Sequence, residues 1–336
     1  MKKILLLILA TAALCSCEKV LDIETNDSPL VVLNGVPSAG EQLFVNLSHS
    51  HFFLDTCTQY PIEGAQIAIT VNGDEMTPSE IVGCNYFFPY TVNEDDTLSI
   101  VATAAGATIS GKTYVPRLPA VSNVSSHIDT TLVFDFLNVD FDLADHMDYN
   151  DYYHIIITCR DSGSRYNPYT DSIVHRDTIV RKMFYCTDRN LTAAEVSAYL
   201  PIGGYFFERL LVTDKLIEGQ SRHVRLMMPM LKDTNEIAPF RHDYTLDIET
   251  VTPERFLYIQ QSFRAANNMT IFSDTPEVYS NLSGGHGIFA GNARRTFPLH
   301  PDTASVPLPT TLPQQAVATL LQQQMRNASH RQSETK

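Results

Sequence analysis

Two histidines near the N-terminal end of the chain have a spacing at which they could share a metal ion. His49 and His51 alternate in a segment with strand character, so both imidazoles would lie on one face, about 7 Å apart. Asp55 follows as a third possible ligand. Because no nearby residue fixes a fourth ligand, we regard His49 and His51 as weak metal candidates and expect solvated polar positions on the outer face of a strand.

A second group of potential ligands is acidic. Asp140, Asp142 and Asp145, followed by Asp148 and Asp151, crowd the approach to a predicted strand. Carboxylate oxygens suit Ca²⁺, but the spacing is not that of an EF-hand loop, because no glycine occupies the sharp turn after the third ligand. Asp140, Asp142 and Asp145 are therefore weak calcium candidates, and an acidic solvated loop is the expected structure.

Two motifs resemble nucleotide-binding or catalytic sites but lack the context that such sites need. Residues 106–113 satisfy the P-loop pattern G-x-x-x-x-G-K-[ST], but a phosphate site requires a helix that begins at the lysine. Pro116 and Pro119 follow instead, so the segment predicts a hairpin. His286 lies among glycines, and the sequence has no G-x-S-x-G elbow or H-E-x-x-H helix to partner it. We expect no enzyme, no nucleotide and no cofactor.

The N-terminus predicts export and a lipid anchor. Two lysines precede an apolar stretch, and the LCSC run from Leu14 to Cys17 resembles the lipobox of bacterial lipoproteins. The stretch is shorter than the roughly 20 apolar residues that a membrane-spanning helix needs. We predict that residues 1–16 are a signal peptide, that Cys17 carries the lipid and that residues 17–28 are a tether to the outer membrane, on either of its faces.

The net charge and the cysteine content limit the possible binding partners and disulfide bonds. The net charge is −14, and removal of residues 1–16, which contain two lysines and no acidic residue, makes it more negative. This charge argues against binding to nucleic acid and against adhesion to anionic lipid through basic segments. In addition to the lipidated Cys17, the mature chain would contain four cysteines that permit three disulfide pairings: Cys57, Cys84, Cys159 and Cys186. We favour Cys57–Cys84 and Cys159–Cys186, each closing a loop of about 27 residues and contributing about 3 kcal/mol. Four unpaired thiols are the alternative.

Short β-strands must position most of these side chains. Apolar and polar residues alternate in runs that are separated by turn signals, such as Asn-Gly at 34–35 and 72–73. For residues 29–118 we predict an immunoglobulin-like or transthyretin-like β-sandwich, which ends at a joint stiffened by prolines. Its predicted strands are 30–33, 42–48, 65–71, 86–92 and 97–102.

Residues 119–300 predict a second β-rich domain with short helices. A capping box starts one helix at Thr192, and Thr252-Pro253 starts another, because proline at the first helical position loses no amide partner. Residues 301–336 are a tail, helical at most over 314–325. The predicted strands of this domain are 131–136, 152–159, 172–183, 206–213, 222–228 and 244–250.

Three segments carry a family resemblance: LVVLNG at 30–35, FFERLLVTDKLIEG at 206–219 and YSNLSGGHGIFAG at 279–291. Together they resemble the Bacteroidota outer-membrane lipoproteins grouped as domain of unknown function 4249. The chain departs from that family's pattern at His286, where a small or apolar residue is more usual. The resemblance implies an N-terminal immunoglobulin-like module, a second β-rich region, an outer-membrane location and no established catalytic residue.

The functional expectation combines the anchor, the β-sandwich and the lack of catalytic motifs. We expect a non-enzymatic cell-envelope lipoprotein that is an accessory or binding partner of a TonB-dependent outer-membrane receptor, because the resembling family is often encoded beside such receptors. The alternative is a surface adhesin or fimbria-type subunit in which an edge strand mediates assembly by β-augmentation. A hydrolase with an unrecognised site is the third hypothesis.

Overall fold

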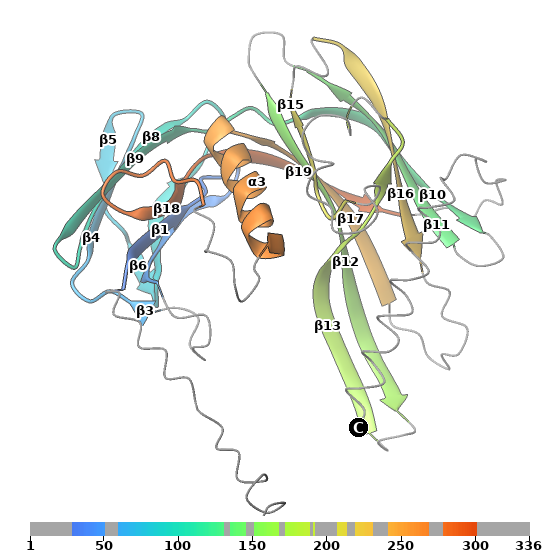
Figure 1. Cartoon of the computed structure of the whole chain (residues 1–336), viewed down its shortest axis with the longest axis horizontal. Helices are drawn as coiled ribbons and strands as arrows, with labels where there is room; N and C mark the ends of the chain where they lie inside the picture. The colour runs from blue at the N-terminus through green and yellow to red at the C-terminus, as the bar shows by residue number, and fades with distance from the viewer. Residues whose placement is uncertain are drawn as a thin grey trace, which may run out of the picture.

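The computed structural model describes residues 29–50, 60–130, 135–145, 151–167, 172–188, 191, 207–213, 219–230, 241–268 and 278–300. Two β-lobes lie side by side, with the helix α3 (Pro253–Asn268) between them (Figure 1). The chain is mainly β, which confirms the predicted class. The predicted signal peptide, Cys17, the tether, the helix at Thr192 and the C-terminal tail lie outside the described residues.

Two sheets form the N-terminal lobe. One has the strand order β18-β1-β2-β7-β6, with β3 beside β2, and the other has the order β5-β4-β8-β9. Leu43, Val45 and Leu47 of β2 are fully buried and alternate with more exposed residues, as a strand with one face on a core requires. The strands are β1 Val31–Gly35, β2 Gln42–His49, β3 Tyr60–Pro61, β4 Gln66–Val71, β5 Asp74–Met76, β6 Glu80–Val82, β7 Asn85–Thr91, β8 Thr97–Ala104 and β9 Ala107–Tyr114. The five strands predicted in this region coincide with β1, β2, β4, β7 and β8.

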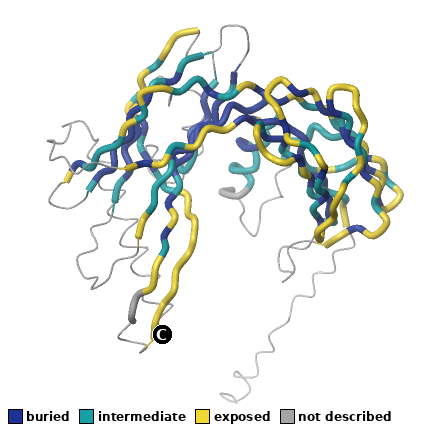
Figure 2. Tube along the Cα trace, turned by 180° about the vertical axis from the view of Figure 1, so that it is seen from behind, coloured by how far each residue is buried: buried dark blue, intermediate teal, exposed yellow. Residues whose placement is uncertain are grey.

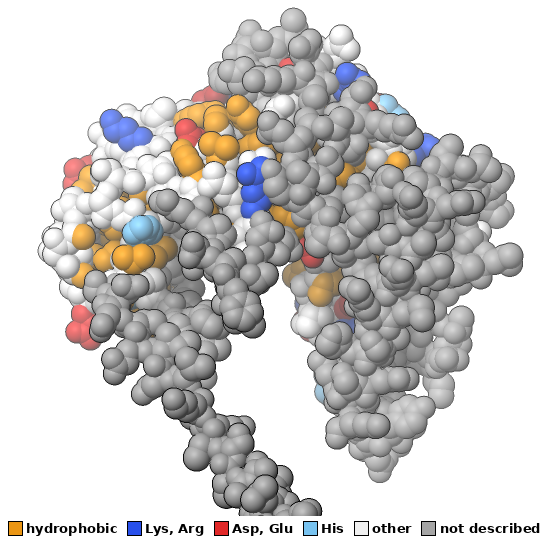
Figure 3. Space-filling view, in the orientation of Figure 1, with side chains coloured by type: hydrophobic (Ala, Val, Ile, Leu, Met, Phe, Trp, Pro, Cys, Tyr) orange, Lys and Arg blue, Asp and Glu red, His pale blue; other side chains and the backbone are white. Residues whose placement is uncertain are grey.

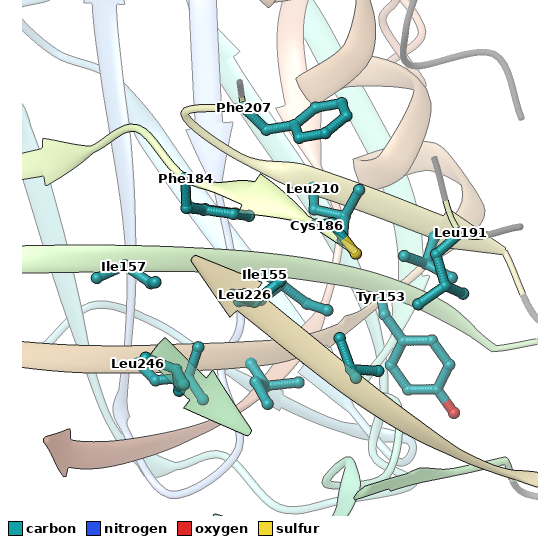
Figure 4. Close-up of a cluster of buried hydrophobic side chains, with 14 of the residues drawn as sticks. Tyr153, Ile155, Ile157, Phe184, Cys186, Leu191, Phe207, Leu210, Leu226 and Leu246 are labelled. Atoms are coloured by element: carbon teal, nitrogen blue, oxygen red, sulfur yellow. The ribbon is translucent and has the colours of Figure 1, made fainter. Parts of the chain in front are cut away.

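Two further sheets form the C-terminal lobe. Their strand orders are β10-β11-β16-β14 and β13-β12-β17-β19, with β15 beside β12. Apolar side chains from both sheets, among them Tyr153, Ile155, Phe184 and Leu226, make one buried core (Figure 4). The strands are β10 Ala120–Thr130, β11 Asp135–Ala144, β12 Tyr152–Asn167, β13 Ser172–Lys182, β14 Tyr185–Cys186, β15 Leu210–Thr213, β16 Ser221–Met230, β17 Arg241–Val251 and β19 Asn292–Leu299.

The helix α3 begins where the sequence predicts. Pro253 occupies its first position, and the backbone amide of Arg255 donates to the Thr252 hydroxyl at 3.4 Å. Phe256 packs against Tyr152 of β12, with ring centroids 5.1 Å apart. The apolar face of the helix therefore covers the outer face of the five-stranded sheet.

The predicted division at residue 118 needs one correction, because the chain returns to the N-terminal lobe. Strand β18 (His286–Phe289) pairs in parallel with β1, and Leu33 lies opposite Gly287. Phe289 is fully buried in the N-terminal core. The next strand, β19, belongs to the C-terminal lobe. Burial of Phe289 in the N-terminal core explains why residues 286–289 return to the N-terminal lobe. The C-terminal lobe is therefore not one continuous segment of the chain.

The glycine-rich stretch at 279–291 holds β18 against the N-terminal lobe through hydrogen bonds and close backbone contacts. The Asn281 side chain accepts a hydrogen bond from the Phe289 amide at 2.9 Å and donates to the Phe289 carbonyl at 2.7 Å. A Cβ on Gly284, Gly287 or Gly291 would lie 2.2, 2.1 or 2.0 Å from a backbone carbonyl oxygen. These glycines permit a close backbone approach, so the stretch has a structural role, and His286 lies exposed beside it.

Candidate functional site

The structure places the weak metal candidate His49 at the end of β2. Its Nδ1 is buried and has no hydrogen-bond partner among the described residues. His51 and Asp55 lie outside those residues. The histidine pair therefore stays a prediction.

The acidic candidates Asp140 and Asp142 contact basic side chains on the neighbouring strand β16. Arg225 Nε of β16 donates to Asp140 Oδ1 at 2.6 Å, and His223 Nδ1 lies 2.8 Å from Asp142 Oδ1. Hydrogen bonds from Asn123 and His223 lower the pKa of Asp142. Both carboxylates thus have basic protein partners on β16.

Asp145 has different partners. The Gly219 amide donates to Asp145 Oδ2 at 2.8 Å, and the Tyr153 hydroxyl lies 3.5 Å from Asp145 and 3.1 Å from Asp151. Asp140 and Asp142 lie in the strand β11 and not in the expected acidic loop, and the weak calcium candidates Asp140, Asp142 and Asp145 therefore all contact protein donors. His223 contacts both Asp140 and Asp142, whereas Asp145 contacts Gly219 and Tyr153.

The predicted Cys159–Cys186 disulfide is wrong, because both thiols are unpaired. Cys159 belongs to the five-stranded sheet, whereas Cys186 belongs to the facing four-stranded sheet and lies within the hydrophobic core (Figure 4). Burial raises the pKa of the Cys186 thiol to about 12. Cys84 is buried in the N-terminal lobe, and its predicted partner Cys57 lies outside the described residues.

The P-loop pattern lies in a β-hairpin, as predicted. Strands β8 and β9 pair from Thr97↔Tyr114 to Ala104↔Ala107, so an extended strand rather than a helix contains Lys112. An open hollow of about 550 Å³ beside Lys112 is lined by Glu254, Tyr279 and other residues. Without a helix N-terminus at Lys112, the hollow lacks the amides that cradle a phosphate.

A different set of reactive side chains meets on the five-stranded sheet. Cys159 and Asp161 lie two residues apart on β12 and therefore share a face. His242 lies directly opposite Asp161 on β17. The possible ligand atoms of these three residues all lie within 4.8 Å of one another, and among the described residues this is the one such group of Cys, His and acidic side chains.

The Asp161 carboxylate is the centre of this cluster. Cys159 Sγ donates to Asp161 Oδ1 at 3.1 Å, and His242 Nδ1 lies 2.7 Å from the same oxygen and 4.0 Å from the sulfur. Arg176 Nη1 of β13 lies 3.7 Å from Asp161 Oδ2. Cys159 and Asp161 are buried, whereas the His242 side chain is 39% exposed. One side of the cluster therefore faces solvent.

The protonation of the cluster follows from its contacts. Burial raises the pKa of Cys159 to about 12, and the hydrogen bond to Asp161 acts in the same direction. Burial also opposes ionisation of Asp161, but hydrogen bonds from His242 and Cys159 outweigh it and lower the pKa of that carboxyl. At neutral pH the cluster therefore contains a neutral thiol and a carboxylate.

This arrangement does not match a Cys-His-Asp nucleophile. In such a triad the thiol contacts one imidazole nitrogen and the acid contacts the other. Here Cys159 and Asp161 both approach Nδ1 of His242, and the thiol donates a hydrogen bond to the carboxylate. The histidine is therefore not placed to activate the thiol.

Sequence reasoning missed this cluster because its members are distant along the chain. The sequence around Cys159 indicates only a disulfide candidate, and His242 follows Asp161 after 81 residues. The segments 152–159 and 244–250 both predict strands, but nothing in the sequence indicates that they are neighbours. Only the β12–β17 register places His242 beside Asp161.

Comparison with protein families decides the identity of the chain. The sequence model described as "Domain of unknown function (DUF4249)" matches residues 18–297. The chain belongs to this family. The acidic residues Asp140 and Asp142 on β11 and the Cys159–Asp161–His242 cluster are thus features of a DUF4249 protein.

Solved structures resemble the DUF4249 chain only distantly, and no curated protein matches it. "Biofilm associated protein - B domain" is 10% identical and covers 79% of this chain and 85% of that chain, with a TM-score of 0.18. The Enterococcus faecalis MSCRAMM ACE is 12% identical, with coverages of 83% and 96% and a TM-score of 0.18. The collagen adhesin (CNA) from S. aureus is 9% identical, with coverages of 80% and 94% and a TM-score of 0.16. TM-scores this low support no functional argument.

The DUF4249 chain also presents a long open sheet edge. Among the described strands, β13 is an edge strand of the five-stranded sheet and pairs only with β12. Ser172 to Arg181 are all exposed, including Ile173 at 62% and Ile179 at 71%. Figure 2 shows the β12–β13 hairpin extending away from the lobe. No helix within the described residues is long and apolar enough to cross a membrane.

Proposed function

We propose that this DUF4249 chain is a lipid-anchored, non-enzymatic protein of a bacterial outer membrane that binds a TonB-dependent receptor. In this proposal the anchor is Cys17. The N-terminal lobe is an immunoglobulin-like or transthyretin-like module that holds the C-terminal lobe away from the tether. The receptor contributes an extended segment that pairs with the edge of β13.

The observation that carries the proposal is the combination of length and exposure in β13. An unpaired strand edge presents backbone donors and acceptors to any extended segment, and folded proteins usually blunt long edges. β13 has 11 residues, ten of which are exposed. Addition of a strand to this edge would provide main-chain hydrogen bonds, while Ile173 and Ile179 would contact side chains of the partner.

Other exposed apolar residues are less suited to this role. Hydrophobic side chains also appear on the surface of the N-terminal lobe, at the left of Figure 3, and Ile81 of the edge strand β6 is 59% exposed. However, β6 has only three residues. A short edge offers few hydrogen bonds, so β13 is the better site for strand addition.

The cluster on the five-stranded sheet supports the non-enzymatic part of the proposal. The thiol of Cys159 is protonated and lacks an activating base. The net charge of −14 disfavours nucleic acid as a partner. The first observation argues against a cysteine nucleophile, and the second argues against a nucleic-acid partner.

A crosslinking experiment tests the proposal with matched isoleucine variants. The lipidated chain is crosslinked mildly in its native outer membrane, recovered, and the captured proteins are identified. We expect a stoichiometric TonB-dependent β-barrel with the wild type. With Ile179→Lys we expect about tenfold less of the receptor, because pairing of a receptor segment with β13 would bury the charge of the lysine.

The control is Ile81→Lys, which adds the same charge at an exposed position of the short edge strand β6. It should recover the receptor as the wild type does. Capture of no receptor by the wild type would refute the proposal. An equal loss with both variants would refute the assignment to β13.

The same open edge favours one second candidate, a surface adhesin or fimbria-type subunit. In that case β13 would accept a strand of another copy. Two results together would favour this candidate over the receptor partner. The mature chain would self-associate in sedimentation experiments, and Ile179→Lys would abolish this association. Crosslinking would capture only the chain itself or pilus-like subunits.

A further inference from the structure

We infer that Cys159, Asp161 and His242 form a binding site for one Zn²⁺ ion. Thiolate, carboxylate and imidazole are the three side-chain ligands that zinc accepts in proteins. The three residues occur together, on two hydrogen-bonded strands, with their donor atoms directed at one another. This inference does not depend on the proposed receptor.

The distances between the donor atoms are close to those of a tetrahedral site. Zinc–ligand bonds of about 2.3 Å to sulfur and about 2.0 Å to nitrogen or oxygen imply separations of about 3.5 Å for pairs that include sulfur and about 3.3 Å for nitrogen and oxygen. The observed separations are 3.1 Å for Sγ–Oδ1, 4.0 Å for Sγ–Nδ1 and 2.7 Å for Nδ1–Oδ1. Shifts of less than about 1 Å therefore bring the three atoms around one ion.

The ligand types select the metal. Calcium and magnesium take oxygen ligands and would leave the thiol and the imidazole unused. A sulfur, a nitrogen and an oxygen together favour zinc. Binding replaces the S–H bond of Cys159 by a sulfur–zinc bond, and the proton passes to solvent. His242 binds zinc through Nδ1 as an imidazole that carries its proton on Nε2, so the hydrogen that Nδ1 donates to Asp161 is displaced from Nδ1 as well. The bound ion, the thiolate and the carboxylate then sum to zero charge.

The surroundings are compatible with this exchange. Arg176 contacts Oδ2 of Asp161, whereas Cys159 and His242 both contact Oδ1. The guanidinium can therefore keep its oxygen while zinc takes the other. Lys182 is a further positive charge near the cluster, and Tyr244 lies opposite Cys159 on β17. Because His242 is 39% exposed, water can supply the fourth ligand.

The position of the site explains what the ion would stabilise. Asp161↔His242 is the penultimate pair of the β12–β17 ladder, which ends at Ser162↔Arg241. Beyond it, β12 continues to Asn167 and, among the described strands, pairs there with β13 alone. An ion bound here would join β12 to β17 at the base of the projecting hairpin.

Metal titration of the mature chain in detergent tests the inference. We expect the wild type to bind one equivalent of Zn²⁺ by calorimetry. We expect Co²⁺, used as a spectroscopic probe, to give a thiolate-to-cobalt charge-transfer band that Zn²⁺ displaces. His242→Gln changes a partly exposed side chain and should fold normally, yet weaken Zn²⁺ binding at least about 100-fold. Cys159→Ser should abolish the charge-transfer band.

Two control variants separate this site from unspecific binding. Cys186→Ser removes the other buried thiol of the same lobe, and His223→Gln removes an exposed histidine that contacts carboxylates. Both should bind Zn²⁺ and Co²⁺ like the wild type. Absence of binding to the wild type, or binding that His242→Gln and Cys159→Ser leave unchanged, would overturn the inference.

Discussion

Gly284→Ala is expected to lower the free energy of unfolding by about 4 kcal/mol. Gly284 has a φ of +79°, and a Cβ there would lie 2.2 Å from the Thr108 carbonyl oxygen. The left-handed backbone contributes about 1 kcal/mol of this cost, and displacement of a backbone atom contributes the remainder. The neighbouring bridge, in which the amides and carbonyls of Ser110 and Ser283 exchange hydrogen bonds, would also be pushed apart. Urea denaturation followed by circular dichroism measures the change.

Gly106→Ala is a matched control for this prediction. Gly106 also has a φ of +79°, but a Cβ there would have no heavy atom within 4 Å. Its neighbour Ala105 already adopts a φ of 50° in the same turn. We expect Gly106→Ala to cost only about 1 kcal/mol. Equal costs for the two variants would show that backbone conformation, and not the close approach to Thr108, makes Gly284 necessary.

Glu249→Ala is expected to lower the free energy of unfolding by about 3 to 5 kcal/mol at neutral pH. Glu249 is 5% exposed, and its Oε2 lies 2.9 Å from His154 Nδ1 and 3.6 Å from Arg255 Nη2. Burial lowers the pKa of His154, so a neutral imidazole donates to the carboxylate. Removal of Glu249 would leave the charge of Arg255 uncompensated between α3 and the sheet, which is the costly way to break a buried ion pair.

Glu249 also predicts a specific loss of stability in acid. Burial alone would raise its pKa, but the hydrogen bond with His154 and the charges of Arg255 and Arg294 lower it to about 2. A carboxyl with a lowered pKa in the folded state stabilises above its unfolded pKa, and this contribution is lost as pH falls through the folded pKa. Between about pH 4.5 and pH 2 the wild type should therefore lose about 3 kcal/mol that Glu249→Gln does not lose.

An exposed ion pair provides the control for the buried one. Asp177 pairs with Arg160 at 2.8 Å, but the two side chains are 62% and 57% exposed. Asp177→Ala should change the free energy of unfolding by less than about 1 kcal/mol at neutral pH. Denaturation curves of the three variants across pH distinguish the pairs. A loss with Glu249→Ala no larger than with Asp177→Ala would contradict the role assigned to the buried cluster.

Local sequence patterns were sufficient for much of the secondary structure. Alternation in residues 42–48 predicts β2, because Leu43, Val45 and Leu47 must share one buried face. Thr252-Pro253 predicts the start of α3, since capping depends on neighbours in the chain. Prolines after Lys112 exclude a phosphate-binding helix, and the structure has the predicted hairpin there.

Pairing between distant segments could not be predicted in the same way. The spacing of Cys159 and Cys186 allowed a disulfide, but the two residues belong to different sheets. The return of β18 to β1 depends on burial of Phe289 in the N-terminal core. A pattern of alternating residues identifies a strand but carries no information about which strand lies beside it.

The sequence by itself therefore determined the mainly β class, most strand positions, the start of α3 and membership in the DUF4249 family. These depend on side-chain periodicity and on short-range backbone chemistry. Only the tertiary structure decided that His242 lies beside Cys159 and Asp161, that Glu249 meets His154 and Arg255, and that β13 ends its sheet. Each of these depends on strand order and register, which are set by burial of the whole set of apolar faces and not by any local run of residues.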